Sequence, residues 1–148
     1  EYRRQRQMCI RDRGWILAGT VTFHKSHPQT KKRLHVSDAR DTARYLLYST
    51  NRRLFNHCVK RRGATLASAV VMGHDAYSEL SHLHFVLGTP HDLSYEQIAS
   101  AVEISIQKAS WCNKEYKLTP YKDTGWLRYM LGHGTGYLLD EYLLKAKS

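Results

Sequence analysis

SHLHFVL, residues 81–87, has the composition of a buried β-strand that carries two histidines. Alternate residues of a strand project to the same face, so His82 and His84 lie side by side, with Phe85 and Leu87 on the opposite face. Two neutral imidazoles held in this way supply half of a divalent-metal site. The stretch therefore predicts a strand with one apolar face and one metal-binding face.

The segments on either side alternate between strand and helix patterns. Ser37 is a suitable N-cap for the first helix, and the capping box SYEQ at residues 94–97 opens the next one. Strands are expected at residues 14–25, 64–74, 81–87 and 113–121, and helices at residues 37–62, 94–111, 125–131 and 137–146. This order predicts an α+β fold, with a central antiparallel sheet and packed helices of the ferredoxin-like kind.

Size, charge and cysteine content limit the classes of function. A chain of 148 residues is most simply one domain, and no apolar run reaches the length of about 20 residues that a membrane span needs. Cys9, Cys58 and Cys112 are odd in number and form no C-x-x-C pair, which argues against a disulfide framework and favours the cytoplasm. The net charge of +10 favours a polyanionic partner, with nucleic acid first.

The first thirteen residues, EYRRQRQMCIRDR, show neither helical nor strand periodicity. The segment RQMCIRDR resembles translated sequencing-adapter DNA, and it lacks the apolar core of a signal peptide. Residues 1–13 are therefore expected to be non-native, with a basic DNA-binding arm as the alternative. Residues 14–148 are expected to form a single domain that is truncated at both ends.

Three motifs in order resemble those of the HUH endonucleases, a superfamily with a ferredoxin-like or RRM-like fold. LAGTVTF at residues 17–23 resembles the first motif, a strand beneath the site. His82-Leu83-His84 resembles the metal motif, and WLRYM at residues 126–130 resembles the third motif, a helix that bears a nucleophilic tyrosine. The resemblance covers most of residues 14–142, and it is closest to the rolling-circle replication initiators of phages, plasmids and related mobile elements.

The resemblance implies metal-dependent nicking and rejoining of single-stranded DNA, through a 5′-phosphotyrosine intermediate made by Tyr129. An unperturbed tyrosine has a pKa of about 10, so attack at neutral pH needs a cation that polarises the phosphate. Two histidines and an oxygen ligand suit Mn²⁺ or Mg²⁺. The implied partners are single-stranded DNA or an origin hairpin, together with a host helicase.

The third metal ligand and the charge beside Tyr129 depart from the family pattern. The family often supplies a Glu from the neighbouring strand, where this chain has His74. Residues 74, 82 and 84 share parity, so a hairpin is expected to bring them to one face, and Glu79 is the alternative ligand. The family usually has a Lys three residues after the tyrosine, where this chain has Gly132.

Basic residues are expected to hold the DNA backbone, and those near Tyr129 are candidates for the missing charge. The predicted DNA-binding set is Arg52, Arg53, Lys60, Arg61, Arg62, Lys122 and Arg128. Two alternative functions remain open. One is a single-tyrosine transposase of the same superfamily, and the other is a nucleic-acid-binding domain without catalysis.

Overall fold

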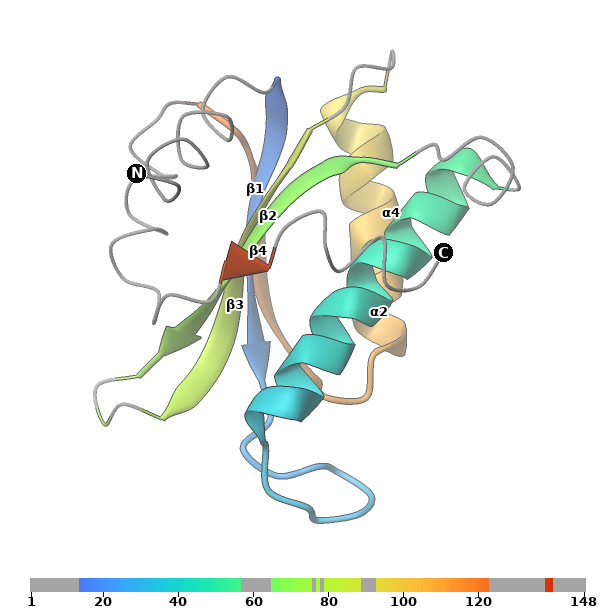
Figure 1. The fold of residues 1–148 in the computed structure, drawn as a ribbon. Helices are drawn as coiled ribbons and strands as arrows, with labels where there is room; N and C mark the ends of the chain where they lie inside the picture. The colour runs from blue at the N-terminus through green and yellow to red at the C-terminus, as the bar shows by residue number, and fades with distance from the viewer. Residues whose placement is uncertain are drawn as a thin grey trace.

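An antiparallel sheet of four long strands with two packed helices forms the centre of the fold, and a fifth strand of two residues lies at one edge of the sheet (Figure 1). The computed structural model describes residues 14–56, 65–75, 77, 79–88 and 93–122, and the backbone of residues 138–139. The elements are β1 (Trp15–Phe23), α2 (Val36–Phe55), β2 (Ala67–His74), β3 (Leu80–Gly88), α4 (Tyr95–Lys108), β4 (Cys112–Pro120) and β5 (Leu138–Leu139). The strand order is β4-β1-β3-β2-β5, and each neighbouring pair is antiparallel.

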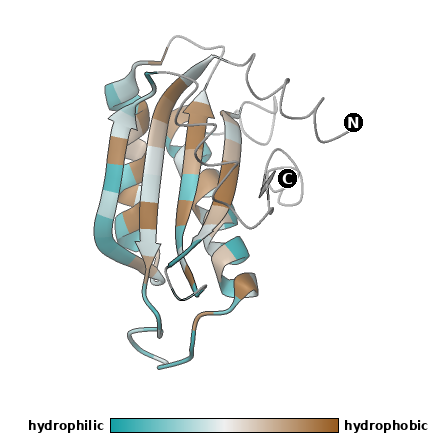
Figure 2. Cartoon of the chain, turned by 90° about the vertical axis from the view of Figure 1, so that its left-hand side faces the viewer, coloured by the Kyte–Doolittle hydropathy of each residue, from teal (hydrophilic) through white to brown (hydrophobic). Residues whose placement is uncertain are grey.

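Both helices cover the same face of the sheet, and the main core lies between these two layers. Figure 2 looks onto the opposite face, with the helices behind the strands. From β3, Leu83, Phe85 and Leu87 enter this core, where α2 contributes Leu46 and α4 contributes Ile98. A smaller cluster on the other face contains Trp15, Ala18, Ala69, Val71 and Val86. The sheet therefore buries apolar side chains on both of its faces.

Strand β1 lies between β3 and β4, and its composition fits this interior position. Its sequence WILAGTVTF is rich in β-branched and aromatic residues, which favour strands. Gly19 is opposite Phe85, and a Cβ at position 19 would meet the Phe85 ring and the Leu118 side chain. The glycine thus makes room for a large aromatic ring in the core.

The predicted α+β arrangement and the order of its first six elements are confirmed. The capping box is also confirmed, because the Ser94 hydroxyl accepts from the Gln97 N–H at 3.2 Å while Gln97 Oε1 accepts from the Ser94 N–H at 2.9 Å. Helix α4 ends at Lys108 rather than near residue 111.

The predicted limits of the first helix are wrong at both ends. Its N-cap is His35 rather than Ser37, and Asp38 Oδ2 accepts from the His35 backbone N–H at 3.0 Å. The helix ends at Phe55 rather than near residue 62, because Asn56 takes a positive φ of 53°. Backbone in this left-handed region leaves the helical path, and asparagine tolerates it better than most residues do.

The predicted C-terminal helix is wrong at its start. Leu138 and Leu139 form β5, which pairs antiparallel with Val71 and Val70 of β2. The helix predicted at residues 125–131 lies outside the described residues, as do the remaining residues of the C-terminal prediction. Within the described part of the chain, no helix is both long and apolar enough to cross a membrane.

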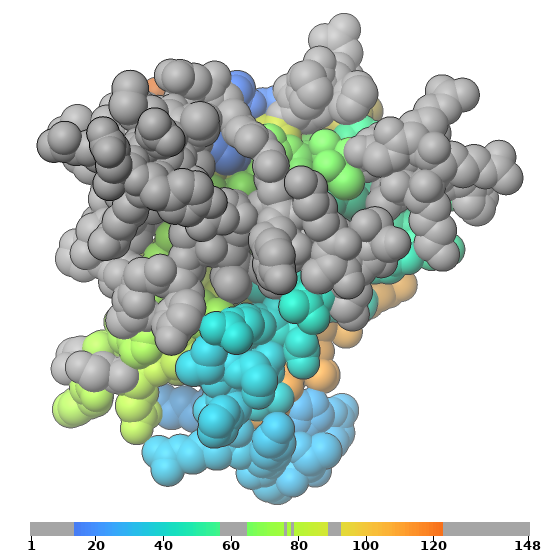
Figure 3. All heavy atoms as spheres, in the orientation of Figure 1, coloured from blue at the N-terminus to red at the C-terminus, as the bar shows by residue number. Residues whose placement is uncertain are grey.

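The segment of residues 24–35, between β1 and α2, forms the lower end of the molecule in Figure 3. It is held by a bridge between Ser26 and Arg33 and by a hydrogen bond from Leu34 N to Lys25 O at 2.9 Å. The His27 ring meets the edge of Trp111, with ring centroids 5.0 Å apart. These contacts give the loop a defined conformation next to the end of the sheet where β3 begins.

Candidate functional site

His82 and His84 lie on β3, the middle strand of the sheet, and face away from both helices. Their neighbours Leu83 and Phe85 enter the core beneath the helices, so strand alternation places the histidines on the other face, which we call the histidine face. His84 is 5% exposed, whereas His82 is intermediate in burial. The predicted alternation along residues 82–87 is confirmed.

The two imidazole rings are close enough to share one cation. Their centroids lie 4.5 Å apart, and the ring planes meet at 74°. With metal–nitrogen bonds of about 2.1 Å, two imidazoles at adjacent positions of an octahedral ion have centroids roughly 4.5–5 Å apart. The spacing of the pair is therefore compatible with two imidazoles bound to one six-coordinate cation.

Each ring has a hydroxyl group at its Nδ1 atom. Thr20 Oγ1 lies 3.0 Å from Nδ1 of His84, and Thr20 is the β1 residue directly opposite His84. Ser81 Oγ lies 2.6 Å from Nδ1 of His82. Both rings are thus held in orientation by the sheet itself.

The pKa of His82 is lowered from its usual value. Burial of the ring is the main cause, because it penalises the charged imidazolium, and the nearby His74 lowers it further. Asp75 acts in the opposite direction, but its effect is the smallest of the three. The lowered pKa favours the neutral imidazole, which is the protonation state that a metal ligand needs.

Gly73 of β2 provides the space that the His82 ring occupies. Gly73 is directly opposite His82, and a Cβ at position 73 would collide with the ring, with Nε2 as its nearest atom. The sequence analysis did not single out this glycine. The signal available was one glycine inside an otherwise apolar strand, which marks a close approach of another group.

The register contradicts the parity argument for His74. Gly73 pairs with His82 and Val71 with His84, so the odd-numbered residues of β2 share the histidine face. The pairing then shifts, and His74 comes opposite Leu80, which packs against the helix-side core. His74 therefore lies near His82, but it is paired with Leu80 and does not project from the histidine face.

The alternative ligand Glu79 is engaged elsewhere. Its Oε1 atom lies 3.3 Å from Nη2 of Arg33, in an exposed ion pair that joins the 24–35 loop to the start of β3. Among the residues that the structure describes, no three His, Cys, Asp or Glu side chains gather in a way that could hold a metal ion. The described site is therefore a two-histidine site.

Lys117 adds a positive charge to the histidine face, and the sequence analysis missed it. Lys117 of β4 is directly opposite Thr20, which is in turn opposite His84 on β3. Directly paired residues project to the same side of a sheet, so these three residues form one row across three strands. With strands about 4.8 Å apart, the row separates the Lys117 and His84 backbones by roughly 10 Å.

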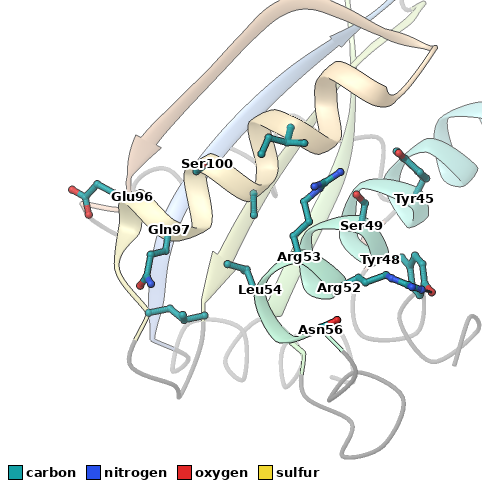
Figure 4. Close-up of a pocket in the computed structure, with 13 residues that line it drawn as sticks. Tyr45, Tyr48, Ser49, Arg52, Arg53, Leu54, Asn56, Glu96, Gln97 and Ser100 are labelled. Carbon is teal, nitrogen blue, oxygen red and sulfur yellow. Dashed lines mark hydrogen bonds between the residues drawn. The ribbon is translucent and has the colours of Figure 1, made fainter.

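Arg52 and Arg53 lie on the far side of the sheet from the histidines. They line an open groove between α2 and α4, shown in Figure 4, whose lining on the α4 side includes Glu96 and Gln97. Arg52 Nη1 donates to the hydroxyl of Tyr48 at 3.1 Å. The structure thus does not bring these two arginines together with the histidine pair, so they cannot contact the same phosphate group.

The other predicted residues are described only in part. Lys122 is exposed and follows β4 after one residue. Cys112 is buried, which raises the pKa of its thiol to about 12 and excludes it as a nucleophile at neutral pH. The predicted residues that lie outside the described part of the chain are Tyr129, Lys60, Arg61, Arg62 and Arg128.

Comparison with known proteins identifies no relative of this chain. No protein-family model matches it, and neither a curated protein nor a solved structure shows significant similarity to it. The functional argument therefore rests on the residues and geometry of the histidine face.

Proposed function

We propose that this domain is an HUH-type endonuclease that nicks and rejoins single-stranded DNA, as a rolling-circle replication initiator does. The strand order β4-β1-β3-β2 with two helices on one face supports a ferredoxin-like fold, which this superfamily uses. The metal motif falls on the middle strand, and both of its histidines point to the face without described helices. A sheet face of this kind is a suitable platform for a DNA strand.

The observation that carries the proposal is the geometry of the histidine pair. Two imidazoles with centroids 4.5 Å apart, each with a hydroxyl at Nδ1, form a rigid half-site for a cation. A bound divalent cation would polarise the scissile phosphate and stabilise the negative charge that develops on it. Lys117 lies in the same row as His84 and would hold an adjacent phosphate of the strand by its charge.

Tyr129 is the proposed nucleophile. Its phenolic oxygen would form a new ester bond to phosphorus as the bond to the 3′ oxygen breaks, and the 3′ oxygen would take up a proton. The energy of the broken bond would be kept in the phosphotyrosine ester, so the reverse reaction can rejoin the strand.

Incubation of the purified protein with labelled single-stranded oligonucleotides and Mn²⁺, followed by a denaturing gel, tests this function. We expect a slowly migrating protein–DNA adduct that is absent from the Tyr129→Phe variant. His82→Ala and His84→Ala should lose the adduct while keeping their fold. His27→Gln is the matched control, because His27 lies in the 24–35 loop and contacts Trp111 rather than the pair.

Two outcomes would contradict parts of this assignment. An adduct that persists in Tyr129→Phe would show that another residue is the nucleophile. An adduct that forms equally well in both histidine variants would refute the metal site. A wild-type protein that is dimeric in solution would favour a single-tyrosine transposase over a replication initiator.

A nucleic-acid-binding domain without catalysis is the second candidate, and two observations favour it. Gly132 stands where the family usually has a Lys, and the described residues supply no third ligand. On this alternative, the protein would bind single-stranded DNA equally well with Mn²⁺ or with a chelator. No adduct would form with a broad oligonucleotide pool.

A further inference from the structure

We propose that Thr20 and Ser81 are positioning residues: they accept the Nδ1–H of His84 and His82, and thereby present Nε2 of each ring to a divalent cation. The cation belongs to the proposed function, whereas the orientation and tautomer of the two rings do not depend on it. The basis is the pair of contacts at Nδ1, 3.0 Å for Thr20 with His84 and 2.6 Å for Ser81 with His82.

Both hydroxyls are fixed by the sheet. Thr20 lies on β1 directly opposite His84, so its hydroxyl approaches the ring from the neighbouring strand. Ser81 precedes His82 on β3 itself. Because one contact comes from the paired strand β1 and the other from the adjacent residue of β3, the rings are oriented before any ligand arrives, and less conformational freedom is lost on binding.

The surroundings of His82 show which of its nitrogens is directed towards a ligand. Its ring fills the space over Gly73, with Nε2 as the ring atom nearest to that glycine, and within the described residues no hydrogen bond involves Nε2. With the proton on Nδ1 and the Ser81 oxygen as its acceptor, the lone pair of Nε2 is left for a ligand. A ligating histidine commonly donates its second N–H in this way, which fixes the tautomer and makes the ligating nitrogen more basic.

Thr20 has the same role at His84, which is the more deeply buried of the two rings. His84 is 5% exposed, so its ring nitrogens need polar partners. The Thr20 hydroxyl accepts from Nδ1–H, and coordination then occurs through Nε2. Thr20 is also directly opposite Lys117 of β4. On β1 it therefore lies between His84, the proposed metal ligand, and Lys117, the proposed phosphate-binding residue.

The first measurement is long-range ¹H–¹⁵N NMR of the ring nitrogens, in metal-free protein at about pH 8, which is above the unperturbed histidine pKa of about 6.5. We expect the Nδ1–H tautomer at His82 and His84. In Thr20→Val, which keeps the β-branched shape without the hydroxyl, the His84 tautomer should change or become mixed. In Thr20→Ser it should stay as in the wild type. Rings in the Nε2–H tautomer in the wild type would overturn the proposal.

The second measurement is Mn²⁺ affinity, from the electron paramagnetic resonance signal of the free ion. Thr20→Val and Ser81→Ala should each weaken binding by about 10–100-fold, which is typical when a hydrogen-bond partner of a metal-binding histidine is lost. Thr22→Val is the matched control, because Thr22 lies on the same strand and face, opposite His82, without a described hydrogen bond to either ring. Equal affinity in Thr20→Val, Ser81→Ala and wild type would overturn the proposal.

The two measurements separate this inference from the proposed function. A wild-type protein that binds no Mn²⁺ would refute the metal-dependent function, and the tautomers alone would then decide the roles of Thr20 and Ser81. Wild-type binding that is insensitive to both hydroxyl substitutions would leave the metal site in place and refute their positioning role.

Discussion

Replacing Gly73 by alanine should destabilise the protein only when His82 is present. The Gly73 backbone lies outside the left-handed region, so alanine can adopt its conformation. Alanine in a strand interior gains about 0.5–1 kcal/mol over glycine, because the unfolded chain has less freedom to lose. In the wild type, however, the new Cβ would occupy the position of the His82 ring.

The cost of moving the ring can be worked out from its contacts. A side chain forced away from its rotamer loses about 0.5–1.5 kcal/mol, and the hydrogen bond between Ser81 and His82 is worth about 0.5–1.5 kcal/mol. Gly73→Ala should therefore change the free energy of unfolding by anything from about zero to a loss of about 2.5 kcal/mol. In a His82→Ala background, the same substitution should stabilise the protein by about 0.5–1 kcal/mol.

Urea unfolding of the wild type, both single variants and the double variant measures this coupling as a double-mutant cycle. We expect a coupling energy of about 1–3 kcal/mol, which is within the range for residues in direct contact. Unchanged m-values would show that the variants share one unfolding reaction. Effects that add to within about 0.5 kcal/mol would refute the reasoning, because they would show that the ring does not occupy the space above Gly73.

Three further predictions test other parts of the structure. Lys117→Ala should weaken single-stranded DNA binding and reduce the slope of log affinity against log salt by about one, as fluorescence anisotropy would measure. Lys114→Ala, on the same strand but in the stretch where its pairing with β1 is irregular and outside the row of Lys117, should change neither. Because the pKa of His82 is lowered, the stability associated with this group is fully present above its unfolded pKa of about 6.5 and is lost as the pH falls through the folded value. Unfolding at a series of pH values should show this loss in the wild type and less of it in His82→Ala, and identical pH profiles would contradict it. Asn51→Ala should cost about 1–3 kcal/mol in urea unfolding, because the buried Asn51 Oδ1 accepts from Leu66 N at 2.7 Å and the alanine side chain offers no acceptor in its place; a loss below about 0.5 kcal/mol would contradict this reading.

Local sequence was sufficient for the order of the first six elements and for the faces that residues 82–87 of β3 occupy. The alternation of residues 82–87 separates the histidines from Phe85 and Leu87 because neighbouring side chains of a strand must point in opposite directions. The capping box at Ser94 was equally predictable, since its two hydrogen bonds join residues only three apart. These features depend on neighbours along the chain.

The ends of the first helix were harder to predict, because several residues compete for each terminus. Ser37 has the better capping side chain, yet the helix begins after His35, where Asp38 binds the free backbone N–H. At the other end, Asn56 leaves the helical path before the basic residues that seemed to continue it. Helix and capping propensities rank the residues that can begin or end a helix, but they do not decide between residues whose propensities are similar.

The sequence by itself determined that two histidines would lie side by side on a strand with an apolar reverse face, because side-chain alternation is a property of the strand alone. Only the tertiary structure decided what surrounds them. The pairing of β2 with β3 placed Gly73, rather than His74, opposite His82, and the pairing of β1 with both of its neighbours aligned Thr20 with His84 and Lys117. A shift of one residue in either pairing would reverse which side chains share the histidine face, and the register is set by burial on both faces of the sheet, which involves residues far apart in the chain.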